Sequence, residues 1–310
     1  MAIYHLTVKI FTRSKGHSAI ACAAYRHGER FHDLRTGQVM DYSRRNGVVD
    51  SMMLAPDHAP SWVYDREALW NRVEARENNS TRPESAQLAR EVEVSLPREL
   101  SWEKNKQLVK EYVTDQFISK GMVADVAFHE SVASDGRPNP HAHIMLTMRE
   151  LKGWEFGNKM RGHNPIFTKG DQVKDKKPLK ILRETWSQYV NQALQDSGSR
   201  ESVDHRSYDD RSINRIPEPK LGAAIRLEKT NPWAAERVAH CRKVRAWNRA
   251  QATLENAEHS GLRRANRRRL HNEEWLREFM HGHMHERVPS PEIIAPEYQG
   301  YQPHTLEPDR

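Results

Sequence analysis

Cysteine is scarce in this chain of 310 residues, which contains only Cys22 and Cys241. Two cysteines so far apart in sequence provide neither a disulfide framework nor a zinc site of the cysteine type. The N-terminus lacks the basic region and the long apolar run of a secretory signal peptide. No stretch approaches the ~18 consecutive apolar residues of a membrane span. These absences predict a protein of a reducing, cytoplasmic setting that does not insert into membranes.

Acidic residues are outnumbered by basic ones, with 42 Asp and Glu against 49 Lys and Arg, so the net charge is +7. The isoelectric point is about 9.3 and the mean hydropathy is −0.89. The hydrophobic fraction of 37% is enough for a folded core. The basic balance favours a polyanionic partner, and nucleic acid is the first expectation. Simple solubility is the alternative interpretation of the same charge.

Three histidines lie in a pattern that predicts a β-hairpin. Residues 122–130 and 139–148 alternate as strands do, and the intervening residues are rich in Ser, Asp, Gly, Asn and Pro. His141 and His143 share one strand face, and folding of the hairpin brings His129 beside them. Three neutral imidazoles converging from strands are a ligand set for a divalent metal ion. The alternative is a polar strand face, because the chain has 17 histidines.

The remaining periodic segments predict an α+β fold. Residues 28–50 are charged and expected to be loop-like, and residues 153–180 are basic and loop-rich. The expected strands cover residues 2–10 and 87–97, with a short strand or ordered loop at 48–54; the expected helices follow Ser18 and cover about 61–77, 101–120 and 181–196. Such an order indicates one mixed, largely antiparallel sheet covered by helices and ending near residue 150.

Two carboxylates, Glu91 and Glu93, lie on the polar face of the strand expected at 87–97. The pattern favours exposure of both side chains to solvent. The alternative places them behind the histidines, where a carboxylate accepts a ring N–H and fixes the tautomer.

The composition changes after about residue 219. An Arg- and Ala-rich stretch predicts a helix over about 232–286, and we assign residues 216–286 to a basic helical extension. Such a helix is either solvated or an arm that follows a DNA backbone. Residues 287–310 are Pro-rich and expected to be disordered.

A nucleophile is also needed if the metal site acts on DNA. Tyr25 lies near the end of the first Ala-rich helix, among several basic residues. An unperturbed phenol ionises only near pH ~10, but a bound cation and adjacent positive charges favour the phenolate. Tyr42 competes for this role, whereas Tyr4 and Tyr112 fall on core faces. The alternative for Tyr25 is an ordinary packing residue.

Four motifs in the order of the chain support a family resemblance. They are Met-Ala-Ile-Tyr-His-Leu at 1–6, Ser-Ala-Ile-Ala-Cys-Ala-Ala-Tyr-Arg at 18–26, Arg-Glu-Val-Glu-Val-Ser-Leu-Pro at 90–97, and Asn-Pro-His-Ala-His-Ile-Met at 139–145. Together they resemble the MobA/MobL conjugative relaxases, MOBQ-type nicking enzymes of the HUH endonuclease superfamily. The resemblance covers about residues 1–215. One departure is Ala142, a small residue where the motif has a bulky hydrophobic one.

The resemblance implies a fold and a reaction. The fold would be a central antiparallel five-stranded sheet flanked by helices. Tyr25 would attack a phosphodiester at a plasmid transfer origin, forming a 5′-phosphotyrosine bond and a free 3′ hydroxyl, and the strand would later be rejoined. A divalent metal ion, Mn²⁺ or Mg²⁺, would be held by His129, His141 and His143. Glu91 or Glu93 would orient a histidine.

The resemblance also implies partners. The substrate would be single-stranded or supercoiled DNA of the transfer origin. Accessory relaxosome proteins and a type IV secretion coupling protein would assist, and the enzyme would travel from the bacterial cytoplasm with the DNA to the recipient cell. The candidate DNA-binding residues are Arg13, Lys15, Arg26, Lys159 and Arg161.

Other functions remain open on the sequence alone. Rolling-circle replication initiators use the same histidine pair, but many carry two tyrosines a turn apart, and this helix carries only Tyr25. A non-catalytic DNA-binding accessory protein would need only the basic arm. A metal nuclease that activates water would leave no covalent adduct.

Overall fold

The computed structural model divides into two compact units, residues 1–211 and 212–310. The described residues are 4–133, 136–164, 166–167, 173–175, 177–219, 221 and 224–259. The predicted tail and the part of the predicted long helix beyond residue 259 lie outside them. Among the described residues, no helix is long and apolar enough to cross a membrane.

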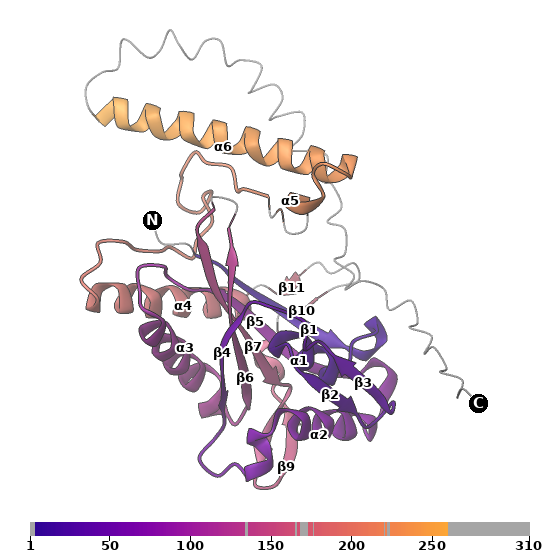
Figure 1. The fold of residues 1–310 in the computed structure, drawn as a ribbon. Coiled ribbons are helices and arrows are strands. Elements are labelled where there is room, and N and C mark those ends of the chain that lie inside the picture. The colour runs from indigo at the N-terminus through magenta and orange to yellow at the C-terminus, as the bar shows by residue number, and fades with distance from the viewer. Residues whose placement is uncertain are drawn as a thin grey trace. The chain divides into compact units, whose positions relative to one another are not determined.

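A five-stranded antiparallel sheet forms the centre of the first unit, with strand order β1-β5-β7-β6-β4 (Figure 1). The strands are β1 (Leu6–Thr12), β4 (Val48–Leu54), β5 (Gln87–Ser95), β6 (Ala124–Val132) and β7 (Pro138–Thr147). The predicted α+β fold is therefore confirmed, and the segment at 48–54 is a strand. Alternation of apolar and polar residues assigns opposite faces of each strand to different layers.

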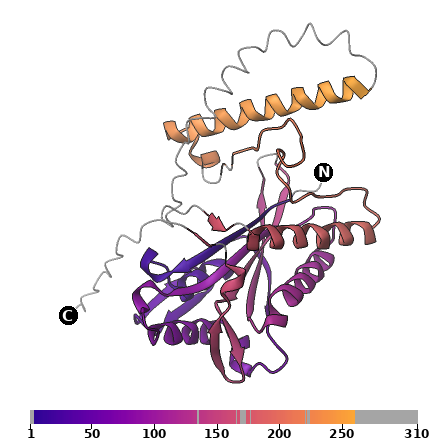
Figure 2. The same cartoon turned by 180° about the vertical axis from the view of Figure 1, so that it is seen from behind.

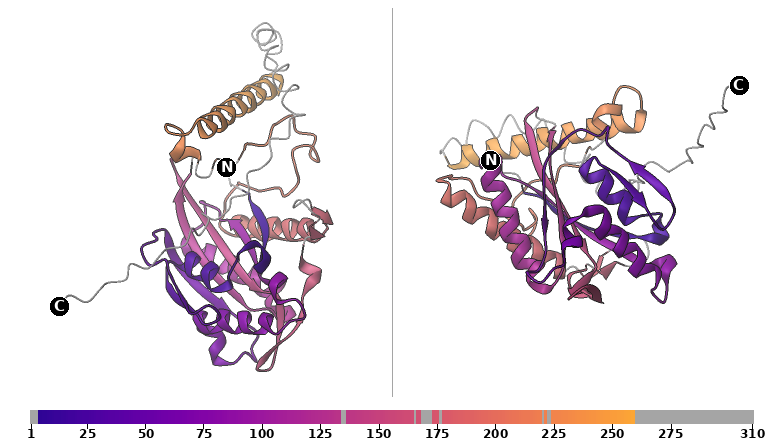
Figure 3. Two further views of the ribbon diagram at one scale, coloured as in Figure 1. Left: turned by 90° about the vertical axis from the view of Figure 1, so that its right-hand side faces the viewer. Right: turned by 60° about the horizontal axis from the view of Figure 1, so that its bottom comes forward.

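One face of the sheet is covered by α3 (Trp102–Gln116) and α4 (Lys177–Asp196), as the right-hand view of Figure 3 shows. The strands contribute an apolar layer to this contact, including Val94, Val126 and Ile144. Both helices were predicted, although α4 begins at Lys177 and a 3-10 turn replaces the end of the predicted 101–120 helix. This layer is the larger part of the core.

The helices α1 (Ala19–His27) and α2 (Arg66–Asn78) pack on the opposite face. Ser18 begins α1 because its side chain accepts a hydrogen bond from the Ala21 N–H. The small residues of α1 pack closely on the sheet and are fully buried at Ala19, Ala23 and Ala24. The rest of this face carries the polar side chains described below.

Two hairpins occupy segments that were expected to be loops. In the first, β2 (Arg30–Asp33) pairs with β3 (Gln38–Asp41), and Phe31 lies opposite Met40 in register. Both side chains are buried in the core cluster of α1 and α2. The expectation of a loop over 28–50 was wrong because four-residue strands are too short to display a clear alternation.

The second hairpin joins β8 (Arg149–Lys152) and β9 (Glu155–Lys159). It is followed by a 3-10 turn and by two short paired strands, β10 (Ile166–Phe167) and β11 (Val173–Asp175). The expectation that residues 153–180 form a loop was therefore also wrong in part. Leu151 and Phe156 supply the buried apolar contacts that hold the β8–β9 hairpin on the core.

The described part of the second unit contains α5 (Ala224–Leu227), α6 (Pro232–His259) and a segment without regular secondary structure before them (Figure 2). A small apolar cluster forms among Leu221, Ala224, Ala234 and Val238. Three arginines of the second unit form ion pairs with carboxylates of the same unit: Arg215–Glu255, Arg242–Glu228 and Arg245–Glu218. Part of the positive charge predicted for this extension is therefore neutralised locally.

Candidate metal centre and active site

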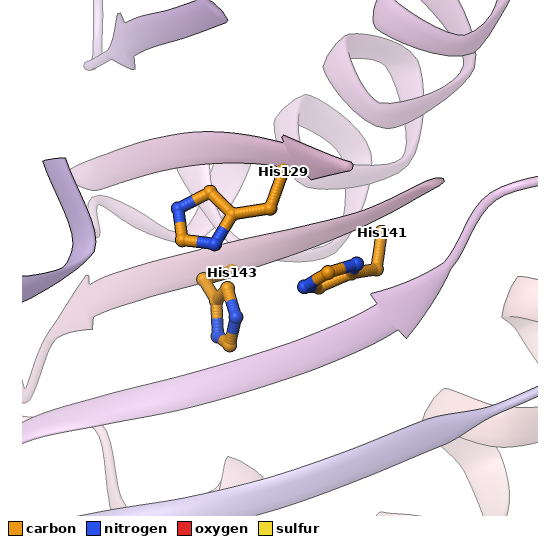
Figure 4. Close-up of side chains that lie close together, drawn as sticks. All are labelled: His129, His141 and His143. Atoms are coloured by element: carbon orange, nitrogen blue, oxygen red, sulfur yellow. The ribbon is translucent and has the colours of Figure 1, made fainter. Parts of the chain in front are cut away.

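Three imidazoles meet on the face of the sheet against which α1 packs (Figure 4). His129 on β6 lies opposite His141 on β7 in the strand register, and His143 follows on the same face. The ring centroids are separated by 4.8–5.4 Å. One ligand atom from each ring lies within 4.8 Å of the others. The convergence predicted from the hairpin is therefore present.

Each of the three rings is held by a hydrogen bond to an oxygen. The contacts are His129 Nε2 to the Arg26 carbonyl at 2.6 Å, His141 Nδ1 to the Asn139 carbonyl at 2.8 Å, and His143 Nδ1 to Glu91 Oε1 at 3.0 Å. Carbonyl and carboxylate oxygens accept, so these ring nitrogens carry the proton and the second nitrogen of each ring keeps its lone pair. A neutral, oriented imidazole is the form that a metal ion requires. The donor set therefore fits a divalent cation.

Burial favours the neutral form of two of these rings. It lowers the pKa of His129 to about 4, with a further contribution from the neighbouring His143. Burial also lowers the pKa of His141. Both side chains are therefore neutral near pH 7, and no proton has to be displaced before they can coordinate a metal ion.

Glu91 is fully buried behind the histidines, so the interpretation of this side chain as solvent-exposed was wrong. Its Oε1 atom accepts hydrogen bonds from Arg26 Nε and from His143 Nδ1. Lys9 Nζ lies 3.4 Å from the other oxygen. Burial alone would raise the pKa of Glu91, but Arg26 and the two hydrogen bonds hold it well below its usual value. The carboxylate is therefore ionised and oriented toward His143.

Glu93 has different surroundings, although it lies on the same strand face. Its side chain is 24% exposed and accepts a hydrogen bond from Lys9 Nζ at 2.8 Å. Burial would raise the pKa of Glu93, but the Lys9 ammonium lowers it to about 2. Of the two carboxylates, Glu91 is the one in hydrogen-bond contact with a histidine.

Tyr25 stands in the last turn of α1 with 46% of its surface exposed. The carbonyl of the following residue, Arg26, contacts His129, so this turn of the helix lies against the imidazole cluster. The rings of Tyr25 and Tyr42 pack perpendicular to each other at a centroid distance of 5.3 Å. The Arg45 guanidinium lies 3.5 Å from the Tyr25 ring centroid. The phenol ring is thus exposed at the end of a helix that contacts the cluster, and a guanidinium lies over it.

Arg45 was not among the residues predicted from the sequence to take part in the site. Its Nη1 nitrogen is buried and has no hydrogen-bond acceptor among the described residues. Its charge also contributes to the lowered pKa of His129 and of His141. The only signal in the sequence is the Arg44-Arg45 pair in a segment expected to be a loop, and no periodicity connects that segment with Tyr25.

Two of the other tyrosines considered as nucleophiles have hydroxyls that are engaged in hydrogen bonds. Tyr112 is fully buried and donates to the Leu182 carbonyl at 3.1 Å. Tyr4 donates to the Arg183 carbonyl at 2.6 Å. Tyr42 is half-buried against Tyr25 itself.

Three of the five candidate DNA-binding side chains are engaged inside the fold. Arg13 pairs with Glu74, Arg26 with Glu91 and Lys159 with Glu77, and all three carboxylates are buried. Their charges are matched within the protein. Lys15 and Arg161 are exposed. The two groups could not be separated from the sequence because the partner carboxylates come from distant segments.

The sequence model of the MobA/MobL family matches residues 17–230, a range that includes Tyr25, Glu91 and the three histidines. The chain belongs to the MobA/MobL family. The predicted family membership is thereby confirmed, over a region close to the residues 1–215 on which the resemblance was based.

Several MobA/MobL-related proteins are similar over most of the chain. The conjugal transfer protein TraA of Rhizobium radiobacter is 34% identical over 88% of this chain and 25% of its own length. The mobilization protein MobL of Acidithiobacillus ferridurans is 34% identical over 86% of this chain and 75% of its own length. Mobilization protein A of Escherichia coli is 30% identical over 73% of this chain and 30% of its own length. The chain spans about a quarter of the length of the TraA relatives.

A solved structure described as "Molecular Basis of Vancomycin Resistance Transfer in Staphylococcus aureus" has the same fold. It is 31% identical in sequence, covers 67% of this chain and all of its own chain, and superposes with a TM-score of 0.56. The superposed share is consistent with a fold common to the sheet and the helices that pack on it.

Proposed function

We propose that this protein is a plasmid mobilisation relaxase, a site- and strand-specific DNA endonuclease and transesterase that nicks the transfer origin. One observation carries the proposal. Tyr25 is exposed on α1, and the next residue, Arg26, contacts the three-histidine cluster through its carbonyl. The names of the relatives, which are mobilization and conjugal transfer proteins, support the same function. We assign the chemistry to residues 1–215.

In the cleavage step, Tyr25 Oη attacks the phosphorus of the scissile phosphodiester. The bond between phosphorus and the 3′ oxygen breaks, that oxygen takes a proton, and the 5′ phosphate stays esterified to Tyr25. In rejoining, a 3′ hydroxyl attacks the same phosphorus and the phenolate of Tyr25 leaves. Because the phosphodiester is exchanged and not hydrolysed, the DNA ends can be religated without an external energy source.

The three imidazoles would hold a divalent cation, Mn²⁺ or Mg²⁺, which when bound polarises the scissile phosphate and offsets its developing negative charge. The protein's own task is to fix the ligands. Glu91 orients His143, and the carbonyls of Arg26 and Asn139 orient the other two rings. Arg45 and Tyr42 both pack against the phenol ring.

The DNA partner is the origin of transfer, presented as a single strand or in supercoiled plasmid. Lys15 and Arg161 lie on the exposed surface, where phosphates can reach them, and the basic extension over 216–286 adds charge for backbone binding. The partners implied by the MobA/MobL resemblance, accessory relaxosome proteins and a type IV secretion coupling protein, complete the assembly. The protein acts in the bacterial cytoplasm and is transferred with the DNA.

The test is a covalent adduct assay with single-stranded origin DNA and Mn²⁺. We expect a protein–DNA band that survives denaturation, loss of that band in Tyr25→Phe, and its retention in Tyr42→Phe. A band that persists in Tyr25→Phe would disprove the assignment of the nucleophile. Nicked DNA without an adduct would indicate a nuclease that activates water, and binding without a nick would indicate an accessory protein.

A second arm of the test separates metal binding from DNA binding. Replacement of His141 or His143 by Ala should abolish Mn²⁺ binding in calorimetry with little change in DNA affinity. Equal loss of both affinities would mean that these side chains maintain the fold and do not form a metal site.

A further inference from the structure

Arg26 occupies a buried position between α1 and two strands of the sheet. Its Nε donates to Glu91 on β5, and its guanidinium lies 4.7 Å from the ring centroid of Phe11 on β1. Its Nη1 donates to the Cys22 carbonyl, one turn earlier in the same helix, at 2.9 Å. Only 12% of the side chain is exposed, so this arginine is not part of a free basic surface.

The same residue contacts the histidine cluster by two routes. Its carbonyl accepts from His129 at 2.6 Å. Its side chain donates to Glu91 Oε1, the oxygen that also accepts from His143. Two of the three imidazoles are thus positioned, directly or through one carboxylate, by the residue that follows Tyr25 in the chain.

The chemistry of this contact favours arginine over lysine. A guanidinium can donate from Nε to the carboxylate and from Nη1 to the helix carbonyl at once, while its planar face packs on an aromatic ring. Lysine has a single ammonium and cannot reproduce both directions. Removing the arginine would leave the buried Glu91 carboxylate with the more distant Lys9 as its remaining cation, and the orientation of that carboxylate would be lost in part.

We propose that Arg26 is a positioning residue that couples the placement of the Tyr25 helix to the geometry of the metal centre. Metal binding and correct seating of α1 then support each other, because both use the Arg26–Glu91 pair. The part of the proposal that concerns metal affinity stands without DNA chemistry, whereas the part that concerns the rate of attack by Tyr25 rests on the proposed function.

The experiment measures Mn²⁺ affinity by titration calorimetry on the full chain. We expect Glu91→Gln to weaken Mn²⁺ binding about 10- to 100-fold and Arg26→Met about 10-fold, the range found for residues that orient metal ligands. The double variant should match Glu91→Gln alone, because both changes remove the same interaction. Arg30→Met, which changes an exposed arginine just beyond α1, is the matched control and should bind like the unmodified chain.

Arg26→Lys keeps the positive charge that pairs with Glu91. It replaces Arg26→Met in the Mn²⁺ titration if that variant does not fold. It should bind Mn²⁺ with an affinity between those of Arg26→Met and the unmodified chain, and thermal unfolding reports whether the fold is intact. Unchanged Mn²⁺ affinity in folded Arg26→Met or Arg26→Lys would overturn the proposal. So would losses that simply add in the double variant, since independent effects would exclude a path through Glu91.

The rate of adduct formation at saturating Mn²⁺ and DNA tests the second half of the coupling. We expect Arg26→Met to slow this step by about 10-fold even when metal is saturating, because the seating of α1 is altered as well. A rate restored fully by excess Mn²⁺ would limit Arg26 to metal affinity and overturn the coupling to Tyr25. If the unmodified chain binds Mn²⁺ but forms no adduct, the proposed function fails while the calorimetric result still decides the role of Arg26.

Discussion

The two faces of the central sheet are built in different ways. One face is a continuous apolar layer under α3 and α4, where Val126, Phe128 and Ile144 are fully buried. The other is apolar only beneath α1 and α2, and its remainder carries histidines and carboxylates. The first face therefore supplies stability, and the second holds the chemistry on a support that the first makes rigid.

The polar face compensates for its lack of apolar contacts with buried carboxylates that accept hydrogen bonds from α1. At the start of the helix, Glu74 accepts from the Ala19 N–H at 2.7 Å. At its end, His27 lies 2.8 Å from Asp125, two strands away from the Arg26–Glu91 pair. Ionic anchoring fixes direction as well as distance, which suits a helix that must present one side chain at a defined angle.

The largest expected effect is on the apolar face. Trp186 of α4 is fully buried and packs against Tyr112 at a ring centroid distance of 4.9 Å. Trp186→Ala should lower the free energy of unfolding by about 4 kcal/mol, because it removes a large buried side chain and leaves a cavity. Urea denaturation measures this loss. The Mn²⁺ affinity of the folded protein should stay unchanged. A loss of Mn²⁺ affinity in Trp186→Ala would contradict the assignment of stability to one face and of metal binding to the other.

An intermediate effect is expected from the ionic support of the polar face. Burial would raise the pKa of Asp125, but contacts with His27, Arg66 and Trp70 lower it below its usual value. Asp125→Asn should reduce the free energy of unfolding by about 3 kcal/mol at pH 7, because it leaves buried donors without their anion.

This loss should depend on pH in a defined direction. Since the folded pKa of Asp125 lies below the unfolded value of about 3.9, its stabilisation is complete above that pH and disappears as the pH falls through the folded pKa. The difference in the free energy of unfolding between the unmodified chain and Asp125→Asn, measured by denaturation, should therefore be constant from about pH 7 to 5 and shrink below about pH 4. The control Glu67→Gln changes a partly exposed carboxylate beside His32 and should cost less than about 1 kcal/mol. A difference that grows on acidification would refute the assignment.

The smallest effect concerns the ring of the nucleophile. Arg45→Ala removes the cation stacked on Tyr25, a contact of about 0.5–1 kcal/mol at a partly exposed position, so adduct formation should slow about two- to fivefold. Arg44→Ala, which changes the exposed neighbour, should leave the single-turnover rate unchanged. Equal slowing by both variants would show that the general charge of the segment matters and the stacking does not.

The periodicity of the sequence was sufficient to predict four of the five strands of the central sheet, β1, β5, β6 and β7, and their faces. The alternation around His129 and His143 placed the imidazoles on one surface, and the apolar stripe of 101–120 predicted the burial of Tyr112. These features follow from local geometry, because side chains in a strand repeat every two residues and those in a helix about every 3.6.

The choice between the two carboxylates could not be made in that way. In the register of β5 and β7, Glu93 lies directly opposite His143, and Glu91 lies opposite Met145. The hydrogen bond nevertheless runs diagonally from His143 to Glu91, because Lys9 holds Glu93 and Arg26 holds Glu91. These choices depend on side chains from three segments, which no local pattern encodes.

The basic residues illustrate the same limit. Three basic residues that were expected on a DNA-binding surface are each paired with a buried glutamate: Arg13, Arg26 and Lys159. Two of those glutamates belong to α2, whose apolar stripe was predicted without any indication that Glu74 and Glu77 face inward. Burial of a charged side chain becomes evident only when its partner is known.

The ionic anchors of α1 have a consequence for the exchange of parts between related enzymes. A tyrosine helix taken from a relative would arrive without the acidic residues that receive it, since Glu74, Glu91 and Asp125 belong to three other elements. Chimeras that transplant the helix alone should misplace the nucleophile, and recombination points that keep these four pieces together should be tolerated.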